Sequence, residues 1–164
     1  MSLCTPSWEI ARHLVTPEQV LKGYNDATVS MTTLNLQAAR LMHKHGAHAA
    51  TDVTGFGLAG HAGNLAEFQE GNVDFRIHTL PIFANFARVC AQLIEKGGRN
   101  FKLLQGLSSE TSGGLLVSLS PDSAEAFVKD MVAGGGTAWV VGDVVEGTKT
   151  ATIAENPNII EVSY

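Results

Sequence analysis

The residues best suited to chemistry lie in one stretch, which reads Ala50-Thr51-Asp52-Val53-Thr54-Gly55-Phe56-Gly57-Leu58-Ala59-Gly60-His61. A carboxylate at the end of a strand, two glycines that let backbone approach a ligand, and the start of a helix together suit a phosphate with its bound cation. In this interpretation Asp52 would suit Mg²⁺, which usually takes one or two protein carboxylates. In the same interpretation Thr54, Gly55 and Gly57 would contact the phosphate cofactor.

The same spacing has a simpler interpretation, in which Asp52 only caps the following helix and the two glycines only form a tight turn. Aspartate is a common helix cap, and a pair of glycines is a weak phosphate motif. On spacing alone this simpler interpretation is favoured.

A second candidate stretch is Glu110-Thr111-Ser112-Gly113-Gly114, just before an expected strand over residues 115–119. Its hydroxyls and backbone N–H groups could face a ligand or support the first loop. The two glycines could equally serve only to let the backbone turn into the sheet, so both roles stay open here.

Histidine and cysteine are not arranged as a metal centre in this sequence. His43 and His45 are two positions apart on an expected helix, so they point about 200° away from each other, and with His48 they are best explained as a solvated helix end. Cys90 lies on the apolar face of its own expected helix, which favours a packed core thiol over a nucleophile. Cys4 has no nearby cation to activate it, and we expect two reduced thiols.

Elements that would position these residues follow from the hydrophobic pattern and the capping signals. Thr16-Pro17-Glu18-Gln19 has the form of a capping box at a helix start. Asn156-Pro157 marks an expected break between strands. The expected helices are 16–26, 30–45, 58–70, 81–96 and 120–132, and the expected strands are 48–51, 73–77, 115–119, 139–145, 149–154 and 159–162.

This order predicts an α+β fold. We expect a layered α/β sandwich with a mixed, mainly antiparallel sheet, similar in part to a ferredoxin-type unit. Its apolar fraction of 45% in 164 residues is enough for one globular domain.

Composition excludes several classes of function. The net charge is −5, so no basic face for nucleic acid is expected. No apolar run approaches the roughly 20 residues of a membrane helix, and the start of the chain lacks a secretion signal. We therefore expect a cytoplasmic protein that binds neither nucleic acid nor membrane.

Several stretches together resemble one enzyme family. They are residues 49–62, Asn64-Leu65-Ala66, Glu110 to Leu116, Ala138-Trp139-Val140-Val141-Gly142 and Ile159-Ile160-Glu161-Val162. In this order they look like the C-terminal domain of selenophosphate synthetase (selenide, water dikinase), most of all its eukaryotic form. The related aminoimidazole ribonucleotide synthetases share the expected fold. The resemblance divides the chain into residues 1–14, which are either added residues or a severed inter-domain segment, and a single domain over 15–164.

The resemblance implies an enzyme that converts ATP, selenide and water into selenophosphate, AMP and phosphate. In the family, the aspartate that matches Asp52 helps to hold Mg²⁺ on the nucleotide, so metal binding becomes the favoured role of this residue. A supporting role near that site is implied for Glu110, Thr111, Ser112 and Gly113.

The resemblance also implies what this chain does not contain. The family's N-terminal domain carries the reactive cysteine or selenocysteine, a neighbouring lysine, a glycine-rich segment and further metal-binding aspartates. We therefore predict no catalytic residue in this chain. Binding of ATP and Mg²⁺ is expected to need that N-terminal domain, and the chain alone is expected to be inactive. The parent enzyme is expected to be a homodimer. The alternative hypothesis is a non-catalytic docking or regulatory domain with the same fold.

Overall fold

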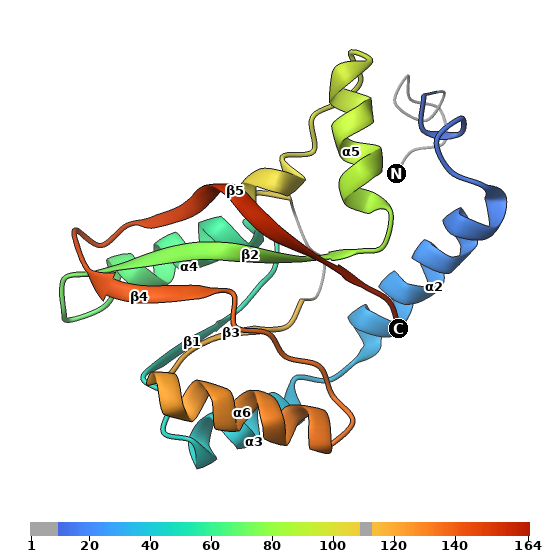
Figure 1. Cartoon of the computed structure of the whole chain (residues 1–164). Coiled ribbons are helices and arrows are strands. Elements are labelled where there is room, and N and C mark those ends of the chain that lie inside the picture. The colour runs from blue at the N-terminus through green and yellow to red at the C-terminus, as the bar shows by residue number, and fades with distance from the viewer. Residues whose placement is uncertain (1–9, 109–112) are drawn as a thin grey trace.

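The structure is a computed structural model, and it describes residues 10–108 and 113–164. Figure 1 shows helices packed around two small sheets, with α2 extending at one end of the molecule. The helices are α2 (Pro17–Thr32), α3 (Leu36–Lys44), α4 (Gly57–Glu67), α5 (Phe86–Glu95) and α6 (Pro121–Ala133), with the 3-10 helix η1 (Leu103–Gln105). The strands are β1 (Ala49–Asp52), β2 (Val73–Phe83), β3 (Leu115–Ser118), β4 (Gly142–Glu146) and β5 (Ala151–Val162).

The strands form two sheets. One sheet pairs β1 with β3 in antiparallel orientation. The other has the order β4-β2-β5, in which β4 is antiparallel and β5 is parallel to the central strand β2. The predicted α+β class with mixed strand orientations is thereby confirmed, with the strands divided between two sheets. Among the described residues, no helix is both long and apolar enough to span a bilayer.

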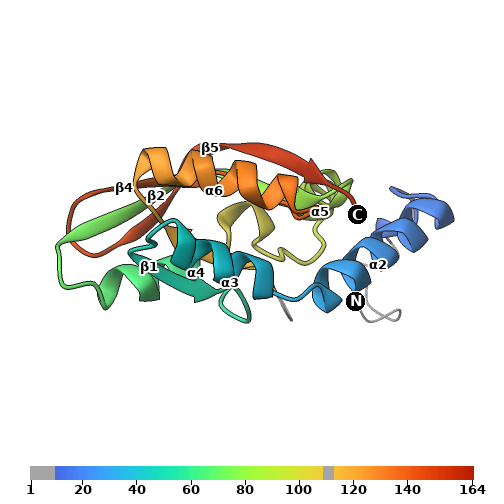
Figure 2. The ribbon, with the colours of Figure 1, turned by 90° about the horizontal axis from the view of Figure 1, so that it is seen from below.

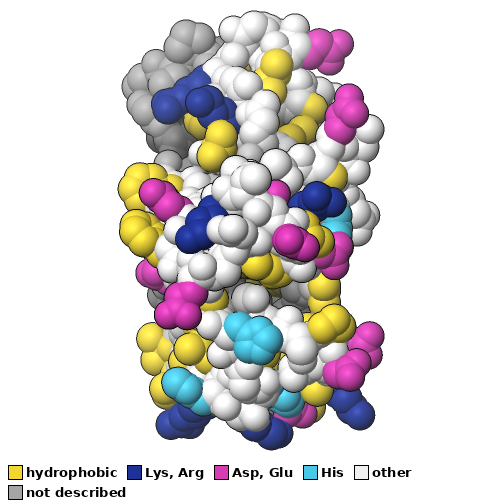
Figure 3. All heavy atoms as spheres, turned by 90° about the vertical axis from the view of Figure 1, so that its left-hand side faces the viewer, with side chains coloured by type: hydrophobic (Ala, Val, Ile, Leu, Met, Phe, Trp, Pro, Cys, Tyr) yellow, Lys and Arg dark blue, Asp and Glu magenta, His cyan; other side chains and the backbone are white. Residues whose placement is uncertain are grey.

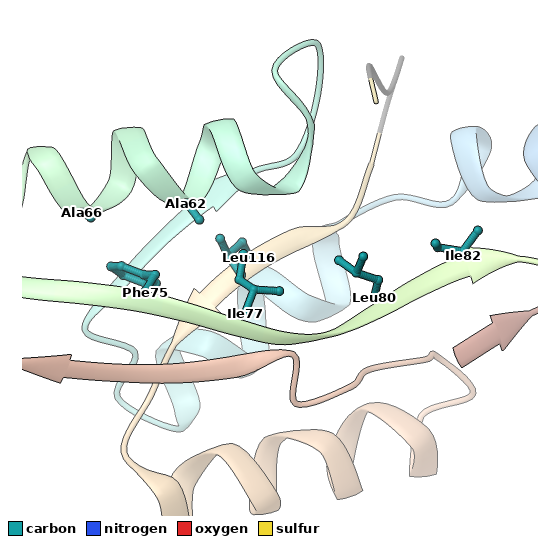
Figure 4. Close-up of a cluster of buried hydrophobic side chains, with 7 residues drawn as sticks. All are labelled: Ala62, Ala66, Phe75, Ile77, Leu80, Ile82 and Leu116. Carbon is teal, nitrogen blue, oxygen red and sulfur yellow. The ribbon is translucent and has the colours of Figure 1, made fainter. Parts of the chain in front are cut away.

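The main core lies between α4, β2 and β3. Ala62 and Ala66 of α4 are completely buried, and their small side chains let the helix approach Phe75 and Ile77 of β2 (Figure 4). Leu116 of β3 joins the same cluster, so this core connects the two sheets. The helix that follows Asp52 is therefore fixed to the centre of the fold by burial of apolar surface.

The first predicted helix is correct at its start and too short at its end. The capping box is present, with the Thr16 side chain accepting from the Gln19 N–H. The helix then continues to Thr32, and the predicted helix over 30–45 begins only at Leu36. Met31 and Leu34 are exposed. The apolar positions that suggested one continuous helix over 30–45 are therefore divided between the end of α2, the connection after it and α3.

The expected helix start at Pro81 is wrong. β2 continues through Pro81 to Phe83 because β5 pairs with it on one side, with Pro81 opposite Ile160. Helix α5 begins only at Phe86, after Asn85 turns the chain with a φ of 69° and donates its N–H to the Glu161 carboxylate at 2.9 Å. The pairing with β5 overrode the local signal of the proline.

The two strands expected over 149–154 and 159–162 are one strand. β5 passes through Asn156 and Pro157, and the sheet absorbs the interruption as a register shift between Ile77 and Thr79 of β2. The strand expected over 139–145 is shorter and begins at Gly142.

Helix α2 and the residues before it contact the rest of the fold at few points. The buried Asp26 carboxylate accepts from Lys22 Nζ at 2.9 Å and from the backbone N–H of Tyr164 at 3.2 Å. Residues 10–15 reach α5, where Ala11 packs with Val89 and Leu93.

Asp74 holds the turn between β4 and β5. Its Oδ1 accepts from the N–H groups of Thr148 and Thr150 at 2.8 and 2.9 Å and from the Thr150 hydroxyl at 3.0 Å. These hydrogen bonds, first those from the Thr150 and Thr148 backbone, lower the pKa of Asp74 below its ordinary value of 3.8. They favour the ionised carboxylate in the folded state.

We expect the Asp74→Asn variant to show a flatter acid dependence of stability than the wild-type chain. A carboxyl whose folded-state pKa is depressed stabilises the fold above its unfolded pKa, and this contribution is lost as pH falls through 3.8 towards the lower folded value. Urea unfolding at about pH 7, 4 and 2.5 measures the dependence. Equal slopes for the two proteins would contradict the assignment to Asp74.

Candidate functional site

Asp52 is the last residue of β1, opposite Leu115 of β3. Its side chain is exposed, and among the described residues its carboxylate has no hydrogen-bond or ion-pair partner. The antiparallel pairing fixes the backbone, so the strand presents a free carboxylate at its tip. Such a group can bind a hard cation without first breaking a contact within the protein.

The structure rules out the simpler interpretation of Asp52 as a helix cap. The residue before α4 is Phe56, and no side chain of the described residues caps this helix. Asp52 is separated from the helix by the loop over residues 53–56.

The tight-turn role of the glycines is correct for Gly57. It has a φ of +69°, and a Cβ there would lie 2.6 Å from the Gly106 carbonyl oxygen and 2.7 Å from that of Ser108. Only glycine allows this left-handed conformation and close approach together. At Gly55, which is exposed, a Cβ would meet no described atom within 4 Å.

The backbone donors of the predicted phosphate loop are largely used within the protein. The Thr54 N–H donates to His61 Nε2 at 2.9 Å, and the Gly57 N–H donates to the Thr54 carbonyl at 3.0 Å. In the first turn of α4, the Ala59 N–H donates to the Gly106 carbonyl at 2.8 Å. Direct phosphate contacts by Thr54, Gly55 and Gly57 stay predictions, and the N–H groups of Thr54 and Gly57 already have partners.

The second stretch is described only in part, since Glu110, Thr111 and Ser112 lie outside the described residues. Gly113 donates its N–H to the Val53 carbonyl at 3.0 Å, and its own carbonyl accepts from Asn35 Nδ2 at 3.1 Å. A Cβ at Gly113 would collide with the Val53 carbonyl oxygen. Gly113 therefore supports the residue that follows Asp52 and extends the pairing of β1 with β3.

The histidines at the end of α3 are only partly solvated. His43 and His48 are exposed, whereas His45 Nε2 lies 2.8 Å from Asp130 Oδ2, which also accepts from Lys44 Nζ at 2.6 Å. Figure 3 shows histidine and basic side chains at the lower end of one face, the end at which α3 and α6 lie. No group of three metal-binding side chains occurs among residues 10–108 and 113–164.

Cys90 lies on the buried side of α5, as predicted, and burial raises the pKa of its thiol. A protonated, buried thiol is a weak nucleophile. Cys4 lies outside the described residues.

Two hollows lie on the described surface, and Asp52 lines neither of them. One, of about 420 Å³, is lined by Leu34, Leu36, Gln37, Arg40, Leu41 and Asp130. The other, of about 460 Å³, lies between η1, α4 and β5. Neither of these two hollows therefore contains the predicted metal ligand.

The sequence did not predict that the buried His61 of α4 would hold the loop after Asp52. Its only signal is the sequence order, because a residue in the second turn of a helix can reach back to the loop before that helix. The loop over residues 106–108, which packs against Gly57, carries no motif that connects it to Asp52.

Comparison with known proteins gives one family and a consistent set of relatives. Residues 8–155 match the family model described as AIR synthase related protein, C-terminal domain. The chain is 44% identical to selenide, water dikinase 3 of Danio rerio, over 96% of the chain and 38% of that protein. It is 45% identical to selenide, water dikinase 2 of Homo sapiens and to selenide, water dikinase of Dictyostelium discoideum, over 94% of the chain in each case. These matches cover 34% and 44% of those two proteins, so the chain spans less than half the length of these relatives.

Proposed function

This chain belongs to the family of C-terminal domains of AIR synthase related proteins, and we propose that it is the C-terminal part of a selenide, water dikinase. In this proposal the parent enzyme converts ATP, selenide and water into selenophosphate, AMP and phosphate. The chain contributes to the Mg²⁺-ATP site, and the reactive groups come from the N-terminal part of the parent. The parent enzyme is a cytoplasmic homodimer in the same proposal.

The free carboxylate of Asp52 carries the mechanistic part of this proposal. Mg²⁺ prefers carboxylate oxygen and usually retains water and phosphate ligands, so one exposed aspartate is a suitable protein ligand. When bound, the metal neutralises charge on the phosphates. The chain's own part is to hold Asp52 at the tip of β1, with the loop after it fixed by Gly57 and Gly113.

Helix α2 supports the proposal that the N-terminal part of the parent enzyme is a partner of this chain. It extends from one end of the fold, and Figure 2 shows its N-terminal part projecting past the ends of both sheets. It exposes at least 40% of each of the apolar residues Val20, Leu21, Tyr24, Val29 and Met31. Val20, Tyr24 and Met31 are spaced so that they share one face of the helix, and an exposed apolar face is typical of a surface that another body covers. More than half of each relative's length lies outside the region matched by this chain, which is enough for such a body.

The proposal is tested by AMP formation. A full-length protein that contains this chain should form AMP from ATP only when selenide is supplied. AMP formation that does not depend on selenide would contradict the proposed substrate. Absence of any turnover by the full-length protein would favour the alternative of a docking or regulatory domain.

We expect the chain alone to bind Mg²⁺-ATP weakly, with a dissociation constant above the micromolar range. One carboxylate cannot coordinate several metal ions and hold a nucleotide as well. Isothermal titration calorimetry of the chain with ATP and excess Mg²⁺ measures this affinity, and the full-length protein is the positive control. A micromolar dissociation constant for the chain alone would show that its nucleotide site is already complete.

A further inference from the structure

His61 is a buried histidine next to the loop that follows Asp52. It lies in α4 with 8% of its surface exposed. Its Nε2 atom is 2.9 Å from the backbone nitrogen of Thr54 and 3.1 Å from the Thr54 hydroxyl oxygen. We call these two contacts the His61 clasp.

The clasp fixes which ring nitrogen carries the proton. A backbone N–H can only donate, so Nε2 must be the unprotonated acceptor, and the proton of the neutral ring is on Nδ1. The Thr54 hydroxyl then donates to the same nitrogen. The two donors of Thr54 therefore share the single lone pair of Nε2.

With the His61 clasp in place, the polar groups of Thr54 bond only within the segment from Thr54 to His61 among the described residues. The Thr54 carbonyl accepts from the Gly57 N–H at 3.0 Å, so the N–H, hydroxyl and carbonyl of Thr54 all have partners within the protein. A residue used in this way is suited to holding the backbone and not to donating to a ligand. Thr54 stands two positions after Asp52, so its fixation restricts the backbone on which Asp52 sits.

The surroundings of the ring hold it in place. The Phe56 ring packs against His61 with 5.4 Å between ring centroids. A Cβ at Gly60 would lie 2.7 Å from the Phe56 Cβ, so Phe56 can fold over the helix only because position 60 is glycine. The imidazole is thus oriented by packing as well as by Thr54.

We propose that His61 is a positioning residue, which sets the direction in which Asp52 is presented to the metal-nucleotide. This inference rests on the proposed function. His61 makes no hydrogen bond or ion pair with Asp52 among the described residues, so it would act through Thr54. Loss of the acceptor atom frees Thr54, so the end of β1 can fray from its pairing with β3 and the carboxylate can sample other directions, which weakens metal binding more than it weakens the fold.

Two variants separate the acceptor from the bulk of the side chain. His61→Gln places an amide oxygen near the position of Nε2, and His61→Leu fills similar space without an acceptor. In the chain itself, hydrogen exchange of the Thr54 amide should be at least about tenfold faster in the Leu variant and close to wild type in the Gln variant. Equal exchange in all three proteins would overturn the proposal.

The catalytic consequence is measured in the full-length protein. The Mg²⁺ concentration that gives half-maximal AMP formation should rise about tenfold or more in the Leu variant, with substantial recovery in the Gln variant. An unchanged Mg²⁺ requirement in the Leu variant would overturn the positioning role. Lack of turnover in the wild-type protein would instead remove the proposed function, and the Thr54 exchange would still decide whether the clasp exists.

A measurement without any variant covers the case in which His61→Leu fails to fold. The ¹⁵N chemical shifts of the His61 ring in the wild-type chain distinguish a protonated Nδ1 with acceptor Nε2 from the opposite tautomer. The first result supports the clasp. A proton on Nε2 would overturn it, because that nitrogen could not then accept from Thr54.

Discussion

Replacing Asp52 with alanine in a full-length protein that contains this chain should reduce selenide-dependent AMP formation about 100-fold or more. Phosphoryl transfer depends on positioning and on neutralising charge at the phosphates, and a metal ligand contributes several kcal/mol to both. Each 1.36 kcal/mol corresponds to a factor of ten in rate, so even about 3 kcal/mol accounts for the expected loss. Initial rates of AMP formation at saturating ATP measure the effect.

The fold should be unaffected by this substitution, which makes the result interpretable. Asp52 is exposed and makes no described side-chain contact, so the free energy of unfolding should change by no more than about 0.5 kcal/mol. Asp143→Ala is a matched control, because this aspartate is also exposed on a strand, with 72% of its side chain accessible. Near-normal turnover of the Asp52 variant, or an equal loss in the control, would remove Asp52 from the mechanism.

Local signals account for the parts of the fold that the sequence predicted well. The capping box of α2 depends on residues within one turn, and the proline at the start of α6 does the same. The strand, glycine turn and helix around Asp52 also depend on neighbouring residues, so the exposed carboxylate at a strand tip could be predicted without knowledge of the rest of the chain.

Long-range pairing explains what could not be predicted. Pro81 and Pro157 both suggested the end or start of an element, yet Pro81 is paired with Ile160, and Pro157 lies in the short unpaired stretch of β5 between Ile153 and Asn158. No local pattern states that residues about 80 positions apart will be neighbours. The division into two sheets has the same origin, since it depends on which strands find each other.

The candidate site also has some features that depend on neighbouring residues and others that depend on distant ones. The choice between metal ligand and helix cap for Asp52 could not be made from spacing, and the position of Phe56 before α4 decides against the cap. The partners that hold the loop come from several places: His61 in α4, Gly106 and Ser108 after η1, and Gly113 before β3. Glycines 57 and 113 signal a close approach in general, but the sequence does not say which backbone approaches them.

Replacing Gly57 with alanine should destabilise the chain by about 3 kcal/mol or more. A left-handed conformation costs a non-glycine residue about 1–2 kcal/mol. The new Cβ would also lie within 2.7 Å of two backbone carbonyl oxygens, from Gly106 and Ser108, so one segment must move away from the other. That movement threatens the hydrogen bond from the Ala59 N–H to the Gly106 carbonyl. Urea unfolding followed by circular dichroism measures the loss.

Gly63 provides the matched control in the same helix. A Cβ there meets no described atom within 4 Å, and its φ is not in the left-handed region. Gly63→Ala should therefore stabilise the chain by about 0.5–1 kcal/mol, because alanine loses less backbone entropy in a helix than glycine does. Opposite signs for the two variants would establish that the left-handed φ and the close approach at Gly57, and not helix propensity, decide the effect of alanine there. A Gly57→Ala variant as stable as the wild type would mean that the loop over residues 106–108 can yield, and that it does not hold the start of α4 in place.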